Sequence, residues 1–231
     1  MGSEMKEQQH ELSQLRGKYT DWLLTILTIL LILMIFVITP LQAQGVLAIQ
    51  VFAIAGLLVI IVGALVISTS VPVFALLSAA LVANVVVFFL RLYYPWPYNL
   101  YLLAGAWLVI SVTLGSVVAA AVFRRGRITY HRIVGAILLY LLIAVAFASL
   151  FTFVGLSLPN AFRGLALEDN ATLASELFYL SFVTLTSTGY GDIVPAHPIA
   201  RSLCNFESIV GQLYPATLLA RLVTLEIRGR R

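Results

Sequence analysis

Charged residues and cysteine are scarce in this sequence of 231 residues. Only 10% of the residues are charged, against about 25% in an average soluble domain, while 61% are hydrophobic and the mean hydropathy is +1.01. A soluble fold cannot bury that much apolar surface, whereas a lipid bilayer can accommodate it. The single cysteine, Cys204, excludes an intrachain disulfide and a zinc site built from cysteines. We expect it to be a packed apolar residue.

Motifs of several common enzyme classes are also absent. The sequence contains no H-E-x-x-H, no G-x-S-x-G and no phosphate-binding P-loop, and its histidines, His10, His131 and His197, are scattered. We therefore expect neither an enzyme nor an organic cofactor. A net charge of +4 would suggest nucleic acid as the partner of a soluble protein, but here the basic residues cluster beside apolar segments. A lipid bilayer, and not nucleic acid, is the expected partner.

Three long stretches, residues 22–90, 92–123 and 133–162, contain no charged residue. A membrane-crossing helix needs about 20 mostly apolar residues, and turn signals at residues 40–45 and 68–72 divide the first stretch. The predicted spans are residues 22–39, 46–67, 73–90, 101–123, 133–156 and 198–226. The expected fold class is thus an all-α integral membrane protein with six transmembrane helices.

The basic residues of the short loops fall mainly on one side of this arrangement, which indicates the cytoplasmic side. With six spans, both termini share that side, and it collects Lys6, Arg16, Lys18, Arg124, Arg125, Arg127, Arg132, Arg228, Arg230 and Arg231. The opposite side receives Arg91, Arg163 and Arg201. We therefore expect a multi-pass protein of the plasma or inner cell membrane with both termini in the cytoplasm.

The segment between the last two predicted spans differs from an ordinary loop. Residues 157–174 are polar and loop-like, and residues 175–186 form a moderately apolar, helix-like stretch that is too short to cross a bilayer. This stretch predicts a re-entrant helix, which carries Thr184 and Thr186 at its end. The run Ser187-Thr188-Gly189-Tyr190-Gly191-Asp192 follows directly.

Residues 184–192 resemble the signature filter of tetrameric potassium channels, usually T-x-x-T-V-G-Y-G-D. The position of the run, after a short helix and between two spanning helices, matches this family as well. The resemblance covers about residues 133–226, and the first four helices match in number alone. It implies a homotetramer that passes K⁺ passively, because each chain supplies one strand of a filter lined by the carbonyls of four chains.

The resemblance also assigns roles to the filter residues. The carbonyls that coordinate K⁺ would belong to Thr188, Gly189, Tyr190 and Gly191, and the carbonyl and hydroxyl of Ser187 would form the innermost site. Tyr190 would brace the filter against the pore helices, and Asp192 would attract cations at the outer mouth. A strand of alternating handedness needs positive φ angles, which Gly189 and Gly191 can adopt at little cost.

Two filter positions depart from the family pattern. Ser187 stands in place of the commoner threonine, and Thr188 in place of the commoner valine, whose side chain faces away from the pore. Neither change removes a carbonyl, so we expect conduction to persist. Both changes can alter selectivity, and a weakly selective cation channel therefore stays open as an alternative. A non-conducting regulatory membrane subunit is a second alternative.

The last predicted helix carries a candidate gate at residues 211–221. Gly211 stands where the family often has a hinge glycine, although close helix packing explains a glycine there equally well. Pro215 removes a backbone hydrogen bond and is expected to kink the helix. Both residues are therefore candidate gate or hinge positions.

The same helix carries four polar residues that are candidates for the cavity or for coupling. Asn205, Ser208 and Gln212 form one polar stripe at helical spacing, and this stripe is expected to face a water-filled cavity. Glu207 is an ionisable group inside a membrane helix, which marks a functional candidate. Pairing of Glu207 with Arg201 or with a pore-helix hydroxyl is favoured over a direct role in gating.

The first four helices lack the charges of a voltage sensor. No Arg or Lys lies in residues 101–123, although moving one elementary charge through the field is worth about 2.3 kcal/mol per 100 mV. We expect little voltage dependence, and an unidentified ligand or lipid is a candidate regulator. The predicted domains are a cytoplasmic segment (1–20), a four-helix membrane domain (21–123), a cytoplasmic linker (124–132) and an ion-conducting pore domain (133–231).

Overall fold

The structure is a computed structural model that describes residues 22–229, except residues 48, 67–70, 94–97 and 124–129. Each of the six predicted spans coincides with a helix, and a further short helix lies at the predicted re-entrant stretch. The helices after the first are α3 (Ile49–Val66), α4 (Val71–Tyr93), α5 (Asn99–Val122), α6 (Tyr130–Ser157), α7 (Leu173–Leu185) and α8 (Pro198–Gly229). The predicted segment 1–20 and most of the linker 124–132 lie outside the described residues.

The first helix runs through Pro40, where the sequence predicted its end. It spans Trp22–Ala43 and contains a π-helical turn, η1 (Met34–Ile38), followed by α2 (Thr39–Ala43). In this turn the Thr39 amide donates to the Met34 carbonyl, five residues earlier. With the same spacing, an amide at residue 40 would donate to the Ile35 carbonyl. Proline has no N–H, and the Thr39 hydroxyl donates to the Ile35 carbonyl instead, at 2.5 Å. This replacement lets the helix continue past the proline.

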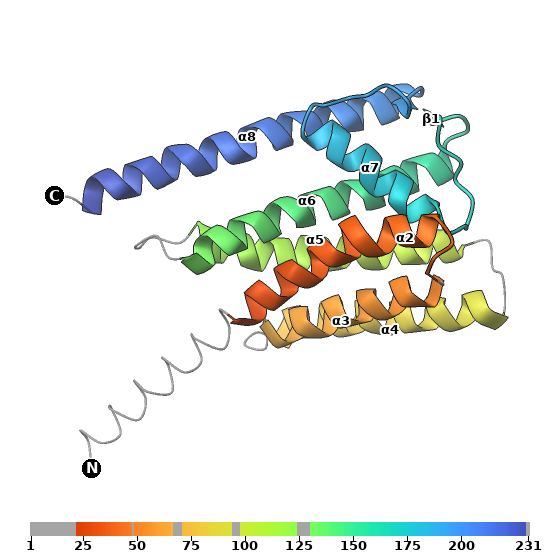
Figure 1. Cartoon of the computed structure of the whole chain (residues 1–231), viewed down its shortest axis with the longest axis horizontal. Helices are drawn as coiled ribbons and strands as arrows, with labels where there is room; N and C mark the ends of the chain where they lie inside the picture. Colours follow the sequence, from red (N-terminus) through yellow and green to blue (C-terminus); the bar gives the residue numbers. More distant parts are fainter. Residues whose placement is uncertain (1–21, 48, 67–70, 94–97, 124–129, 230–231) are drawn as a thin grey trace, which may run out of the picture.

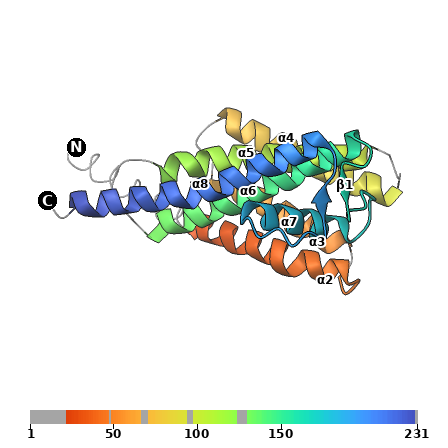
Figure 2. The ribbon, with the colours of Figure 1, turned by 90° about the horizontal axis from the view of Figure 1, so that it is seen from above.

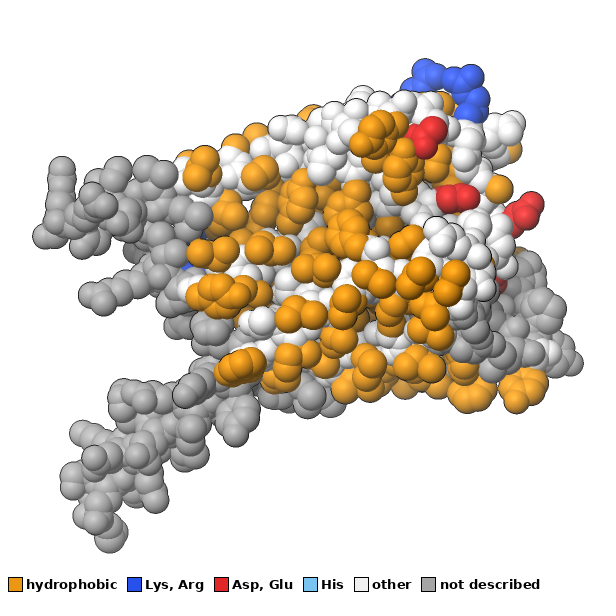
Figure 3. All heavy atoms as spheres, in the orientation of Figure 1, with side chains coloured by type: hydrophobic (Ala, Val, Ile, Leu, Met, Phe, Trp, Pro, Cys, Tyr) orange, Lys and Arg blue, Asp and Glu red, His pale blue; other side chains and the backbone are white. Residues whose placement is uncertain are grey.

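Three described helices are long and apolar enough to cross a membrane: Trp22–Ala43, Asn99–Val122 and Arg132–Ser157. Large apolar side chains are exposed along the helices, and Figure 3 shows them as a broad band, while the described acidic side chains in this view lie at the end near β1. Exposed apolar surface of this extent is typical of a lipid-facing protein. The chain is therefore a membrane protein.

Helices α5 and α6 form the centre of the molecule, with α3 and α4 on one side and α7 and α8 on the other (Figures 1 and 2). Both helices contribute fully buried apolar side chains to the hydrophobic core, among them Ile110, Leu114 and Leu138. Helix α7 packs against both α6 and α8. The re-entrant segment therefore lies against two long helices.

A short antiparallel pairing closes the loops around α7, and sequence reasoning missed it. β1 (Phe162–Arg163) pairs with β2 (Val194–Pro195). At the end of β1, Gly164 has a φ of +81°, and a Cβ there would lie 2.1 Å from the Asp192 carbonyl oxygen. This close approach requires glycine. The pairing fastens the loop before α7 to the chain directly after residue 192.

Candidate functional site

The candidate site begins at the C-terminal end of α7. The chain turns out of the helix with the amide of Thr188 bonded to the Val183 carbonyl at 2.8 Å and the amide of Gly189 bonded to the same carbonyl at 3.1 Å. The Ser187 amide bonds the Thr184 carbonyl at 2.9 Å. These bonds satisfy carbonyls that a helix end would otherwise leave unpaired. They fix the direction in which residues 187–192 leave the helix.

Positive φ angles recur at every second residue of this strand. They are 57° at Ser187, 54° at Gly189 and 85° at Gly191. The two glycines behave as the sequence predicted, but the positive φ of Ser187 was not predicted. A non-glycine residue in this region costs about 1–2 kcal/mol, so contacts of the Ser187 side chain must offset that cost.

Two residues of α8 supply these contacts. The Ser187 hydroxyl lies 2.9 Å from the Ser208 hydroxyl, and the Gln212 side-chain amide donates to the Ser187 oxygen at 3.0 Å. The predicted polar stripe is therefore divided in its contacts: Ser208 and Gln212 bond Ser187 at the start of the strand 187–192, whereas Asn205, which is exposed like Gln212, makes no hydrogen bond to this strand among the described residues. Only tertiary structure shows this division, because the three residues share helical spacing.

The threonines around the strand also have partners. The hydroxyls of Thr186 and Thr188 lie 2.8 Å apart, and the Thr186 hydroxyl is 2.7 Å from the Phe182 carbonyl. The Thr184 side chain forms a hydrogen bond with Cys204 of α8. The hydroxyl introduced at Thr188 is thus accommodated by a neighbouring hydroxyl.

Tyr179 of α7 supports the outer part of the strand. Its ring stacks on Tyr190 with a centroid distance of 6.2 Å and an interplanar angle of 6°. Its hydroxyl bonds the Asp192 carboxylate, which lowers the pKa of Asp192 below its ordinary value. The Tyr190 side chain is 72% exposed in the single chain. Within the chain the Tyr190 ring therefore rests on Tyr179 of α7, and its role as a brace of a filter stays a prediction.

Glu207 of α8 is fully buried and lies against Ser181 of α7. Its Oε1 atom is 2.5 Å from the Ser181 hydroxyl oxygen, which is also 2.9 Å from the Ala144 carbonyl oxygen of α6. Arg201 instead donates to the Pro195 carbonyl at 3.3 Å. Of the two pairings considered from sequence, the structure has the one with a hydroxyl of the short helix, Ser181 of α7.

Gly211 lies where α8 crosses the end of α7. A Cβ at this position would be 1.8 Å from the Leu185 carbonyl oxygen. Of the two interpretations proposed for this glycine, a hinge and close helix packing, the structure supports close packing. Helix α8 continues past Pro215 to Gly229.

Two contacts in the C-terminal half of α8 were not found from sequence. The Tyr214 hydroxyl donates to the Ala136 carbonyl of α6 at 2.7 Å, and its ring stacks on Tyr140. The Arg221 guanidinium donates to the Phe123 carbonyl and lies 5.1 Å from the centre of the Phe123 ring. An arginine within an apolar helix is itself a signal of a paired group, and that signal was available for Arg221.

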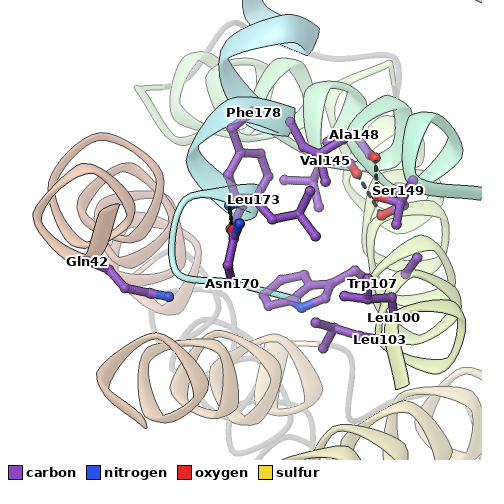
Figure 4. Close-up of a pocket in the computed structure, with 14 residues that line it drawn as sticks. Gln42, Leu100, Leu103, Trp107, Val145, Ala148, Ser149, Asn170, Leu173 and Phe178 are labelled. Carbon is purple, nitrogen blue, oxygen red and sulfur yellow. Dashed lines mark hydrogen bonds between the residues drawn. The ribbon is translucent and has the colours of Figure 1, made fainter. Parts of the chain in front are cut away.

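A separate cavity of about 80 Å³ lies behind α7, where α2, α5 and α6 meet. Figure 4 shows Trp107, Leu103 and Phe178 around it, with Gln42 entering from α2. Ser149 and Asn170 also line the cavity, and both are bonded to the chain, Ser149 to the Val145 carbonyl and Asn170 to the amides of residues 172 and 173. The cavity is mostly apolar and is distinct from the strand 187–192.

Comparison with known proteins finds similarity in the part of the chain that contains this site. Residues 135–227 match a family model described as an ion channel. Protein LctB of Bacillus caldotenax is 32% identical over 91 residues, which cover 39% of this chain and 61% of that protein. The chain thus spans less than two thirds of the length of this relative. No solved structure matches.

Proposed function

We propose that this protein is a potassium-selective channel of the cell membrane, and the match of residues 135–227 to an ion-channel family model supports this proposal. Four copies of the chain would each contribute the strand 187–192 to one central filter. K⁺ would pass down its electrochemical gradient through rings of carbonyl oxygens that replace the ion's water shell. No organic cofactor and no chemical step is part of this function.

One observation carries the proposal: the repeated positive φ of residues 187, 189 and 191 at the end of a short helix. A strand that alternates in handedness can turn successive carbonyls toward one axis, and an ordinary outer loop has no need of this repeat. The C-terminal end of α7 also carries the negative end of the helix dipole, which favours a cation nearby. Backbone and helix therefore both suit a cation pathway.

The exposed surface of the single chain supports assembly as a homotetramer. Residues 186–192 are exposed in the single chain, although a filter strand functions only when it faces other strands. Helix α8 also exposes large apolar side chains, including Phe206, Ile209 and Leu213. Contact with neighbouring subunits around a central axis would cover part of this surface and bring four strands together.

The remaining assignments follow from this arrangement. Gly211 and Pro215 would belong to the inner pore and its gate, and Asp192 would lie at the outer mouth. Residues 21–123 would form a membrane domain without gating charges, residues 133–231 the pore domain, and both termini would be cytoplasmic. The start of the first helix and the end of α8 lie at the same end of the molecule (Figure 1), which supports placing both termini on one side of the membrane.

Ion flux in reconstituted liposomes tests the proposal, with two glycines as a matched pair. Gly191 and Gly45 both have a positive φ, of 85° and 74°, and a Cβ would meet no atom within 4 Å at either position. We expect Gly191→Ala to abolish K⁺ flux, because alanine resists this backbone conformation, and Gly45→Ala to retain it. Absence of flux in the wild type, or equal flux in the two variants, would contradict the proposal.

A weakly selective cation channel is the second candidate. The Thr188 hydroxyl is bonded to Thr186, where the family commonly has an apolar valine side chain. A filter supported by different contacts can differ in rigidity and therefore in its discrimination of K⁺ from Na⁺. Na⁺ flux comparable to K⁺ flux in the same liposomes would favour this candidate.

A further inference from the structure

Glu207 is surrounded by three helices and has no positive neighbour. Its side chain is 0% exposed, and within the described residues no Lys or Arg pairs with it. The titratable groups that face it are Tyr140 from α6 and Cys204 from its own helix, and α7 presents the Ser181 hydroxyl. Burying an unpaired carboxylate in such a place costs several kcal/mol of free energy. Burying the neutral acid costs far less.

The hydrogen atoms around Ser181 can be counted. A serine hydroxyl carries one hydrogen, yet the Ser181 oxygen lies 2.9 Å from the Ala144 carbonyl oxygen and 2.5 Å from Oε1 of Glu207. The carbonyl can only accept. If Ser181 donates to Ala144, the contact with Glu207 needs a hydrogen supplied by Glu207. Each contact has a hydrogen of its own, and neither has to share one in a three-centre bond, only when Glu207 is protonated.

The second carboxyl oxygen of Glu207 agrees with this count. Oε2 is buried and has no hydrogen-bond partner among the described residues. In a carboxylate this atom would carry part of a charge with no donor to stabilise it. In a carboxylic acid with its hydrogen on Oε1, the same atom is a neutral carbonyl oxygen, and leaving it unpaired costs less.

We propose that Glu207 is held as a protonated carboxylic acid and serves as a positioning residue for the filter. Its O–H donates to Ser181, and the Ser181 O–H donates to the Ala144 carbonyl, so this relay joins α8, α7 and α6. Glu207 is adjacent to Ser208, which contacts Ser187 at the base of the filter strand. The acid therefore fixes the pore helix and the filter base relative to the same turn of α8.

The relay predicts closure at high pH, and this part of the inference rests on the proposed channel function. Loss of the proton would leave one hydrogen for two acceptors and a buried charge without a partner. The current should then be full at neutral pH and fall as the pH rises through the titration of Glu207. For a single proton the remaining protonated fraction falls about tenfold for each pH unit above that point.

Infrared spectroscopy of the purified protein in lipid tests the protonation without any need for conduction. At neutral pH, we expect the wild type to show the carbonyl-stretch band of a protonated carboxylic acid and Glu207→Gln to lack it. Ser181→Ala should shift this band, because it removes the acceptor of the Glu207 hydrogen. The absence of such a band from the wild type at neutral pH would overturn the inference, even if the protein proves to be a channel.

The pH dependence of flux tests the positioning role. Glu207→Gln keeps a donor toward Ser181 but cannot titrate, so we expect its flux to be retained and to be insensitive to alkaline pH. Glu168→Gln, which alters an exposed loop carboxyl, should keep the wild-type pH profile and serves as the control. An alkaline decline in Glu207→Gln equal to that of the wild type would overturn the role. If Glu207→Gln fails to fold, the band of the wild type should still disappear at alkaline pH as the current falls, and a band that persists while the current falls would overturn the role.

Discussion

The two halves of this molecule use polar side chains in different ways. In the first half, Thr28, Thr39, Asn84, Ser111 and Ser116 each donate to a carbonyl three or four residues earlier in their own helix. The second half has such local bonds too, for example at Ser149 and Thr152, but there Ser181, Gln212 and Tyr214 also bond partners 25 to 78 residues away in other elements. Local bonds let a helix carry a polar residue in an apolar setting. Bonds between elements fix the relative position of α7, the strand 187–192 and α8.

This contrast predicts that substitutions will act on function mainly in the second half. Apolar packing in the first half fixes the shape of the helix bundle and depends little on any one polar group. The pore half depends on particular hydroxyl, amide and carboxyl groups. The following substitutions test this contrast, beginning with the largest expected effect.

Gly211→Ala should be the most damaging single change. Its Cβ would lie 1.8 Å from the Leu185 carbonyl oxygen, whereas in Gly115→Ala the nearest atom would be 3.6 Å away on a Leu139 side chain. Overpacking typically costs about 1–3 kcal/mol, and contact with backbone gives little relief. We expect a lower thermal unfolding temperature in detergent and loss of flux for Gly211→Ala alone. Equal stability of the two variants, with altered open probability for Gly211→Ala, would instead support a hinge.

Removing the support of Ser187 should lower selectivity. The double variant Ser208→Ala/Gln212→Leu deletes both partners of a residue at a φ of +57°. Without these partners, the backbone cost of about 1–2 kcal/mol at Ser187 is no longer offset. A free-energy difference of this size changes the equilibrium between two backbone conformations by roughly 5- to 30-fold. We expect the K⁺/Na⁺ permeability ratio to fall by a factor in this range.

A control for the double variant lies on the same helix. Thr217 bonds the carbonyls of Leu213 and Tyr214 in its own helix. Thr217→Ala should therefore leave the permeability ratio unchanged. An unchanged ratio in the double variant would show that Ser208 and Gln212 do not support the filter.

Tyr179→Phe should change the response to external acid. The variant keeps the ring that stacks on Tyr190 but loses the hydroxyl that lowers the pKa of Asp192. The Asp192 charge is present above its pKa and is lost as the pH falls through it, so in the variant the charge is lost at a higher pH. The midpoint for proton inhibition of inward current should move upward.

Asp192→Asn identifies the group that titrates in this experiment, because the variant has no carboxyl at the outer mouth. Asp192→Asn should remove the part of the proton inhibition of inward current whose midpoint Tyr179→Phe shifts. If the midpoint for proton inhibition is the same in the wild type and Tyr179→Phe, the hydrogen bond from Tyr179 does not affect the titration of Asp192.

Ser111→Ala should have the smallest effect. Ser111 is buried in α5 and is bonded to the Leu108 carbonyl of its own helix. Loss of this local bond should cost at most about 1 kcal/mol and leave conductance and selectivity as in the wild type. A changed permeability ratio would mean that the first half shapes the filter directly, and the contrast between the halves would be wrong.

The sequence predicted what depends on local pattern. Apolar runs located the helices, because a membrane-crossing helix needs a long apolar segment. The order of Ser187, Gly189 and Gly191 after a short helix located the site, and the glycines indicated positive φ. Residues 135–227 match a family model described as an ion channel, which agrees with the ion-channel part of the prediction made from this run, and potassium selectivity stays a prediction.

Features that depend on tertiary contact could not be predicted. The positive φ of Ser187 depends on Ser208 and Gln212, and nothing in its neighbouring residues indicates it. The pairing of β1 with β2 joins two-residue strands that carry no alternating pattern. The first helix passes Pro40 because a π turn and the Thr39 hydroxyl compensate for the missing amide, a combination that a turn signal does not reveal.

The reversal potential of the purified protein in a planar bilayer, with K⁺ on one side and Na⁺ on the other, tests the central claim most directly. The account predicts a reversal potential near the potassium equilibrium potential, because carbonyls fixed by the strand 187–191 replace the hydration of K⁺ better than that of Na⁺. A measurable current that reverses near zero would contradict selective conduction. It would show that the contacts of Ser187 and Thr188 hold a filter that admits both ions.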